Sequence, residues 1–243
     1  GAERVGHQAV VARHQAQRHA EEEYSETCKA LATYIEGKVD PEPALAPLRS
    51  ATGLRAKVLR QPLSAKSTAK VQAFAARFGL TPFQVFASIC SLAYSRISGQ
   101  RAFLMATPTS NREDHRFAYT IGMMANTLLL PVDLNSKAGL GETIQQLSQD
   151  WKPCLEHPQA ALEHVVAELK QDHPARSGHF GCMFVLENTD YAALQLEGAR
   201  ASFELPPVVE AKAPLTATVL QYEGRMELIA EIQGKIAAGD DFA

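Results

Sequence analysis

The 243-residue chain lacks most features that mark secreted, metal-binding and membrane proteins. Its four cysteines lie far apart with no Cys-x-x-Cys pair, which excludes a disulfide framework and indicates reduced core thiols of a cytosolic protein. No run of about 18 apolar residues predicts a membrane span, and the N-terminus shows no apolar segment of a secretory signal. With 24 basic and 27 acidic residues the net charge is −3, so no nucleic-acid partner is expected.

Common catalytic and metal-binding signatures are missing as well. The sequence holds no His-Glu-x-x-His, no Gly-x-Ser-x-Gly, no phosphate-binding loop and no Gly-x-Gly-x-x-Gly. His157 and His164 could share a helix face, but Pro158 lies between them and no third ligand is near, which favours surface histidines over a metal site. A serine, an aspartate and a histidine gather within residues 107–115, yet the members of a hydrolase triad usually come from separate elements.

Apolar periodicity predicts helices in the first part of the chain. A weak stripe, firm only from Tyr24 onward, predicts a long helix over 8–36 that needs a surface to pack against. Residues 39–63 are expected to be irregular because of Pro41, Pro43 and Pro47, and their basic residues suggest an exposed linker. Helices over 64–78 and 82–97 follow, the second with Thr81 and Gln84 as a capping box. The helix over 82–97 is apolar nearly all round, which predicts burial.

Strands and further helices alternate after this pair. Strands are predicted at 102–107, 123–134, 180–186 and 201–205, with a hairpin of strands 215–222 and 225–232 at the end. Helices are predicted at 142–152, where Pro153 would end the helix, and at 160–170. This order predicts an α/β sandwich with a mixed sheet.

Four segments together are similar to one family. Residues 81–112 keep its Thr-x-Phe helix start, its Arg-x-Ser-Gly-Gln turn and its Thr-Pro followed by Arg, with Ala106 in place of Gly. Residues 121–134 keep most of Ile-Gly-x-Phe-Val-Asn-Thr. Residues 157–163 keep only the ends of His-Gln-Asp-x-Pro-Phe-Glu, and 180–188 resemble a strand that ends in Asn, without the usual Arg-x-x-Ser before it. From Tyr24 to the end, the chain resembles the condensation domain of nonribosomal peptide synthetases.

The resemblance implies a fold and a reaction. The family's domain has two lobes, each like chloramphenicol acetyltransferase, with a mixed, largely antiparallel sheet flanked by helices. It joins an acyl group to an amine, each carried as a thioester on the phosphopantetheine arm of a carrier protein. The catalytic His-His-x-x-x-Asp-Gly belongs to the N-terminal lobe and does not occur in this sequence. The chain therefore resembles the C-terminal lobe (63–243) preceded by a linking helix and Pro-rich connector (1–62), and is expected to be inactive alone.

Site residues and partners follow from the same resemblance. Thr107, Arg112, Asn126 and Asn188 are expected at the substrate tunnel or the lobe interface, and none of them is a catalytic group. Arg112 would pair with the aspartate of the absent motif, although for Arg112 and Asn188 a purely structural role stays open. Expected partners are the N-terminal lobe, peptidyl or acyl carrier proteins and an adjacent adenylation domain, with no cofactor bound directly and no membrane contact.

Three further expectations concern the terminal hairpin and the alternative functions. The terminal hairpin resembles the latch that reaches the other lobe, which would leave a strand edge exposed. The degenerate later motifs keep open a non-catalytic, condensation-like module that recruits carrier proteins. Another acyltransferase of the same superfamily, with its catalytic lobe elsewhere, is the third reading.

Overall fold

The computed structural model describes residues 2–39, 56–112, 121, 124–134, 138–171, 180–187, 213–222 and 225–233. Within these ranges the elements, in chain order, are α1 (Ala2–Lys38), β1 (Ala56–Leu63), α2 (Ala65–Phe78), α3 (Pro82–Ser98), β2 (Ala102–Thr109), β3 (Asn126–Asp133), α4 (Leu140–Leu155), α5 (Leu162–Gln171), β4 (Cys182–Glu187), β5 (Leu215–Tyr222) and β6 (Arg225–Gln233). Helices and strands thus follow the order that the sequence predicts, apart from β1.

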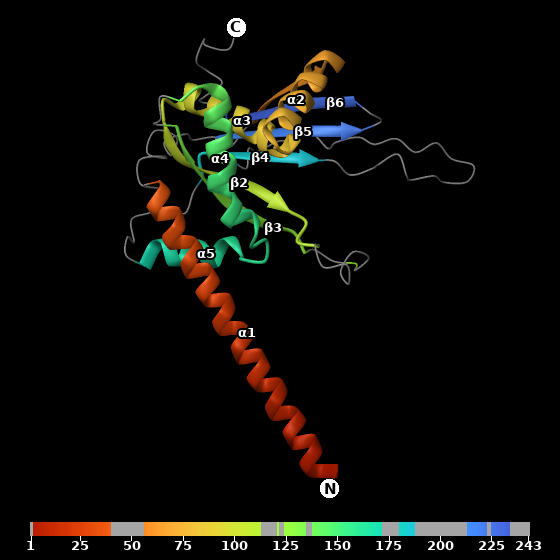
Figure 1. Ribbon diagram of the computed structural model, residues 1–243, viewed down its shortest axis with the longest axis vertical. Helices are drawn as coiled ribbons and strands as arrows, with labels where there is room; N and C mark the ends of the chain where they lie inside the picture. Colours follow the sequence, from red (N-terminus) through yellow and green to blue (C-terminus); the bar gives the residue numbers. More distant parts are fainter. Residues whose placement is uncertain are drawn as a thin grey trace, which may run out of the picture.

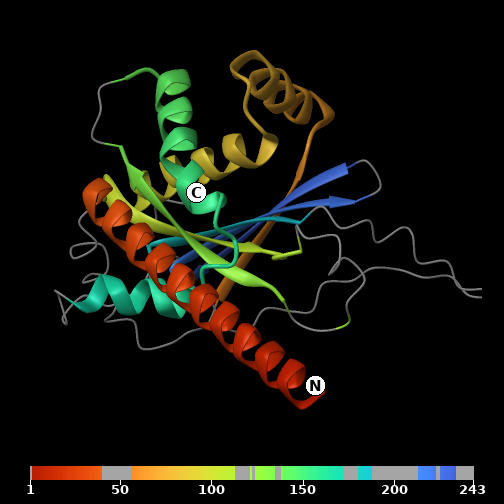
Figure 2. The ribbon, with the colours of Figure 1, turned by 60° about the horizontal axis from the view of Figure 1, so that its bottom comes forward.

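One six-stranded sheet organises the molecule, in the order β1-β6-β5-β4-β2-β3. The neighbours β1/β6, β6/β5 and β2/β3 are antiparallel, whereas β4 runs parallel to both β2 and β5. Helices α2, α3 and α4 lie on one side of this sheet, and α1 and α5 lie together at its β3 end (Figures 1 and 2). The structure confirms the predicted mixed, largely antiparallel sheet flanked by helices.

The capping signals of α2 and α3 form as the sequence predicts. The Thr81 hydroxyl accepts a hydrogen bond from the Gln84 amide at 3.2 Å, and the Gln84 side chain accepts one from the Thr81 amide at 2.8 Å. Gly79 and Gly99 end the two helices at φ 64° and 75°, in the left-handed region that glycine adopts at low cost. Local sequence therefore fixes the start and end of both helices.

The core lies between the sheet and its helices. Trp151 of α4, Tyr94 of α3, and Phe103 and Phe184 of the sheet are its largest fully buried side chains. All four cysteines are buried and free, which confirms the prediction of core thiols. The C-terminal part of α1 packs through Cys28, Leu31 and Ile35, while the rest of its backbone extends away from the sheet (Figure 1).

Residues 56–63 are a strand, contrary to the predicted irregular segment. They pair with β6 along their whole length, and Arg60 forms a two-bond ion pair with Glu227 at 3.1 and 2.8 Å. Pro62 is compatible with this because β1 is an edge strand, where a missing N–H costs no ladder bond on the open side. Residues 40–55 are not among those described. The boundary between the connector (1–62) and the C-terminal lobe (63–243) stays a prediction.

Two helix predictions were also wrong in detail. Pro153 does not end α4, which continues to Leu155, with Trp151 and Cys154 buried on either side of the proline. Packing of the last turn compensates for the backbone bond that proline cannot donate. Helix α3 is not buried all round, since Ile89 is 45% and Ile97 is 38% exposed.

The terminal hairpin lies inside the sheet and not at its edge. Strand β5 is flanked by β4 and β6, and β6 is flanked by β5 and β1. The expected exposed latch edge is therefore wrong for residues 215–233. The strand predicted at 201–205 falls outside the described residues.

Within the described part of the chain, each helix is too short or too polar to cross a membrane. Helices α2 and α3 are long and apolar enough for a membrane span only when they are counted together, and they are bent by 108° where they join.

A glycine at the start of β4 gives a test of core packing. A Cβ on Gly181 would lie 2.6 Å from the ring of Tyr94, which is fully buried and whose hydroxyl donates to the Gln100 side chain at 3.2 Å. We predict that Gly181→Ala lowers the free energy of unfolding by about 1–3 kcal/mol, since the ring cannot move away without strain. Gly37→Ala is the control: its Cβ meets nothing within 4 Å, so alanine should leave stability unchanged or raise it. Equal urea unfolding midpoints for both variants would contradict this account.

Candidate functional site

Three of the four predicted site residues lie at one end of the β2–β3 pair. Thr107 is 2% exposed in β2 and pairs with Leu128, and Asn126 begins β3 opposite Thr109. Arg112 follows β2 and is partly buried. Asn188 lies outside the described residues. The fold thus brings Thr107, Arg112 and Asn126 to one end of the β2–β3 pair.

Asn126 uses its whole amide group on local backbone. Its Nδ2 donates to the carbonyl oxygens of Pro158 and Ala160 at 2.8 and 2.7 Å. Its Oδ1 accepts from the backbone amides of Thr127 and Leu162 at 2.8 and 3.4 Å. Two donors and two acceptor sites are therefore occupied, so this side chain joins the start of β3 to the segment that leads into α5.

Tyr24 of α1 holds the same segment from the other side. Its hydroxyl accepts from the Ala161 amide at 3.0 Å and lies 2.9 Å from Nδ1 of His164, with the two rings edge to face at 5.5 Å. Burial is the main cause that raises the pKa of Tyr24. We call the side chains of Tyr24 and Asn126 with residues 157–162 the turn clamp. It fixes the segment that resembles the third family motif.

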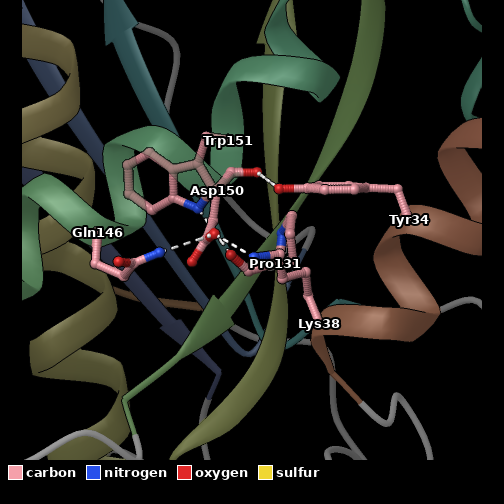
Figure 3. Close-up of polar contacts among 6 residues, drawn as sticks. All are labelled: Tyr34, Lys38, Pro131, Gln146, Asp150 and Trp151. Atoms are coloured by element: carbon pink, nitrogen blue, oxygen red, sulfur yellow. Dashed lines mark hydrogen bonds and ion pairs between the residues drawn. The ribbon is translucent and has the colours of Figure 1, made fainter.

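A second polar cluster joins the end of α1 to α4 (Figure 3). Asp150 is 7% exposed, and its Oδ1 accepts from Lys38 Nζ at 2.6 Å and from Gln146 Nε2 at 3.1 Å. The Tyr34 hydroxyl donates to the Asp150 carbonyl at 3.0 Å. The hydrogen bond with Asp150 is the main cause that raises the pKa of Lys38, and burial raises that of Tyr34. The nearly buried Asp150 carboxylate thus accepts hydrogen bonds from a cation and from an amide.

Both clusters tie helices to the β3 end of the sheet. Among the residues that the structure describes, His, Cys, Asp and Glu side chains form no group of three or more that could hold a metal ion. His164 is exposed and contacts Tyr24, as expected of a surface histidine. The described geometry positions segments at one end of the sheet.

Sequence reasoning missed two residues that organise this region. Tyr24 was identified only as an apolar position of the first helix, although a tyrosine hydroxyl beside a buried stripe commonly finds a partner. Asp150 directly precedes Trp151 on the apolar face of α4, and an acid at such a position signals a buried pair.

The turn clamp can be tested by removing its amide. Asn126→Ala should lower the free energy of unfolding by about 2–4 kcal/mol, because two carbonyls and two amides lose their partner. Asn126→Asp, which keeps one oxygen but loses both donors, should also destabilise. Gln149→Ala, at an exposed position of α4, is the control and should be near neutral. Urea unfolding would measure all three, and an Asn126→Ala midpoint equal to the control would show that the clamp does not stabilise the fold.

Alkaline pH should destabilise the fold, because the folded state favours the protonated form of several groups. Burial raises the pKa of the Cys154 thiol from 9.0 to about 12. A raised pKa means that this contribution is complete below pH 9 and is lost as the pH rises from about 9 to 12, and the raised pKa values of Lys38 and Tyr34 act in the same direction. Cys154→Ala should therefore show a shallower loss of stability over this interval. Parallel pH profiles of the variant and the parent would refute the assignment.

Comparisons with known proteins agree with this fold. The sequence pattern of the Condensation domain family matches residues 11–233. The chain is 29% identical over 138 residues to malpinin synthetase of Mortierella alpina, covering 56% of this chain and 2% of that protein. It is 28% identical over 149 residues to phosphinothricin tripeptide synthetase of Streptomyces viridochromogenes, covering 61% and 13%. The chain thus spans a small part of these curated relatives.

Solved structures of low identity share the fold. The condensation domain of the Monacolin K polyketide synthase superposes with a TM-score of 0.67 at 15% identity, over 91% of this chain and 55% of that one. The first condensation domain of the calcium-dependent antibiotic synthetase, solved with a substrate analogue, gives 0.64 at 19% identity, over 94% and 50%. With a match that covers most of its length, this chain belongs to the condensation domain family.

Proposed function

We propose that this chain is the C-terminal lobe of a nonribosomal peptide synthetase condensation domain. With an N-terminal lobe it forms an amide bond between an acyl donor and an aminoacyl acceptor, each a thioester on a carrier protein's phosphopantetheine arm. One observation carries the proposal: the family pattern covers residues 11–233, yet the chain corresponds to only 50–55% of two solved condensation domains. A single six-stranded sheet is what one lobe of a two-lobed domain would contain.

The catalytic base is then a residue of the N-terminal lobe. The sequence contains no His-His-x-x-x-Asp-Gly. A histidine that orients the amine and stabilises the charged intermediate is needed in the transition state, so this lobe alone should not accelerate condensation. Its part is to form one wall of the tunnel and to hold the other lobe in register.

Each predicted site residue receives a role in this arrangement. Arg112 pairs with the aspartate of the catalytic motif across the lobe interface, where a guanidinium can bind a carboxylate with two hydrogen bonds. Asn188 lines the tunnel, and Thr107, which is 2% exposed, supports it from within β2. Asn126 acts as a positioning residue through the turn clamp, because its amide is fully bound to backbone.

Partners and location follow from the same proposal. The chain contacts the N-terminal lobe, two carrier proteins and a neighbouring adenylation domain in a cytoplasmic synthetase. The four-domain synthetase structure bound to AMP and glycine, similar in fold to this chain at 17% identity, supports a multidomain setting.

The decisive experiment compares the two-lobed protein with the isolated chain. Acyl- and aminoacyl-loaded carrier proteins are supplied to both, and amide formation is followed by mass spectrometry. We expect turnover only from the two-lobed protein, and a decrease of tenfold or more, on the order of 1.4 kcal/mol of transition-state stabilisation, for Arg112→Ala in it. Arg225→Ala, at an exposed position of β6, is the control.

Two outcomes would overturn the proposal. Amide formation by the isolated chain would show that the second lobe is not required. A two-lobed protein that binds loaded carrier proteins without forming an amide would favour the non-catalytic module, for which the degenerate motifs at 157–163 and 172–188 argue.

A further inference from the structure

An apolar cavity of about 390 Å³ lies between helices α2 and α3 and the strands β1, β4, β5 and β6. Its walls are aliphatic and aromatic side chains, among them Leu63, Phe86, Phe184 and Leu228, and the only polar side-chain groups among its described lining residues are the Ser67 hydroxyl and the Cys90 thiol. Protein cores contain few voids larger than a water molecule. A volume of 390 Å³ falls in the range of small-molecule binding pockets.

Small side chains at defined positions create this space. The register places Ala217 of β5 directly opposite Ala230 of β6, and both line the cavity floor. Ala93 of α3 lies between Ile89 and Ile97 on the same helix row and also lines the cavity. Larger aliphatic residues at these three positions would fill the gap between helix and sheet.

The entrance is lined by apolar residues that water reaches. Leu59, Ile89 and Ile97 are 42%, 45% and 38% exposed, and all three line the cavity. They are half of the six large apolar residues that are exposed in the described part of the chain. Concentrated exposure of this kind marks a binding site more often than scattered surface residues do.

A cationic hollow adjoins the cavity along α3. It has a volume of about 620 Å³ and shares Ile89 and Ala93 with the apolar cavity. Arg96 and Arg101 line it, and the described residues of its lining include no acidic side chain. Arg101 Nε donates to the Leu134 carbonyl at 3.1 Å, which orients its guanidinium, and Arg96 is exposed on α3. Continuous apolar and cationic regions suit a ligand with an aliphatic tail and an anionic head.

We propose that this cavity binds the aliphatic chain of an anionic amphiphile, with the head group at Arg96 and Arg101. The chain belongs to a free fatty acid, whose carboxylate ends the alkyl chain directly and so reaches the arginines while the tail occupies the cavity. The site lies between the helices and the sheet, so its occupancy does not depend on amide formation.

Calorimetric titration of the purified protein with decanoate tests the proposal, with decanol, butyrate and decanoyl-phosphopantetheine as the other arms. We expect saturable binding of decanoate, little binding of butyrate, and no tighter binding of the decanoyl-phosphopantetheine thioester, because the pantetheine arm separates its phosphate from the acyl chain. Ala230→Leu, which fills the floor, should weaken decanoate and decanol at least about tenfold. Ala73→Leu, at an exposed position of α2 outside the cavity lining, is the control.

Charge recognition and folding have separate readouts. Arg96→Gln should weaken decanoate but not decanol. If Ala230→Leu unfolds the protein, alkylation of the parent by N-ethylmaleimide replaces it: decanoate should slow the modification of Cys90, which lines the cavity, and leave Cys28 unchanged. Absence of saturable binding by both decanoate and decanol, or unchanged Cys90 alkylation, would overturn the proposal, whatever the outcome of the amide assay.

Discussion

The enclosure of the edge strand β3 is the constraint on which the rest of this end of the molecule depends. Among the described strands, β3 has only β2 as a neighbour, and helices cover other parts of its surface. The Trp151 indole donates to the Pro131 carbonyl at 2.8 Å, and Asn126 bonds to the segment before α5. These bonds are directional, so they set the positions of α4 and α5, and α1 then binds both through Asp150 and Tyr24.

This enclosure also explains how distant segments reach one end of the sheet. Strand β4 enters between β2 and β5 and runs parallel to both, which requires a crossover through α4 and α5. The turn clamp ties the start of β3 to this crossover through bonds that lie outside the sheet. Asn126 therefore joins segments that the strand pairing alone would not connect.

Features encoded by neighbouring residues were predictable from the sequence, and features that depend on tertiary contacts were not. The Thr81–Gln84 capping box and the terminal hairpin involve residues a few positions apart, and both form as predicted. Strand β1 was missed because Pro62 and the prolines before it argue against a strand unless its edge position is known. The role of Asn126 was equally hidden, since its partners lie more than 30 residues away. The family motif marks Asn126 as a tunnel or interface residue, which stays a prediction, and its hydrogen bonds appear only in the fold.

The two ends of the sheet solve the packing problem differently. At the β3 end, large rings such as Trp151 and Phe103 fill the space and polar clamps lock the helices. At the β1 end, the Ala217–Ala230 pair leaves a hollow beneath α3, and α2 contributes only Ala75 to the buried core. Fewer buried contacts mean a lower cost of local opening, so α2 and β1 should open more readily than α4 and β3. A sheet that is rigid at its β3 end and opens more readily at its β1 end can hold a fixed interface at the first end and admit a ligand at the second.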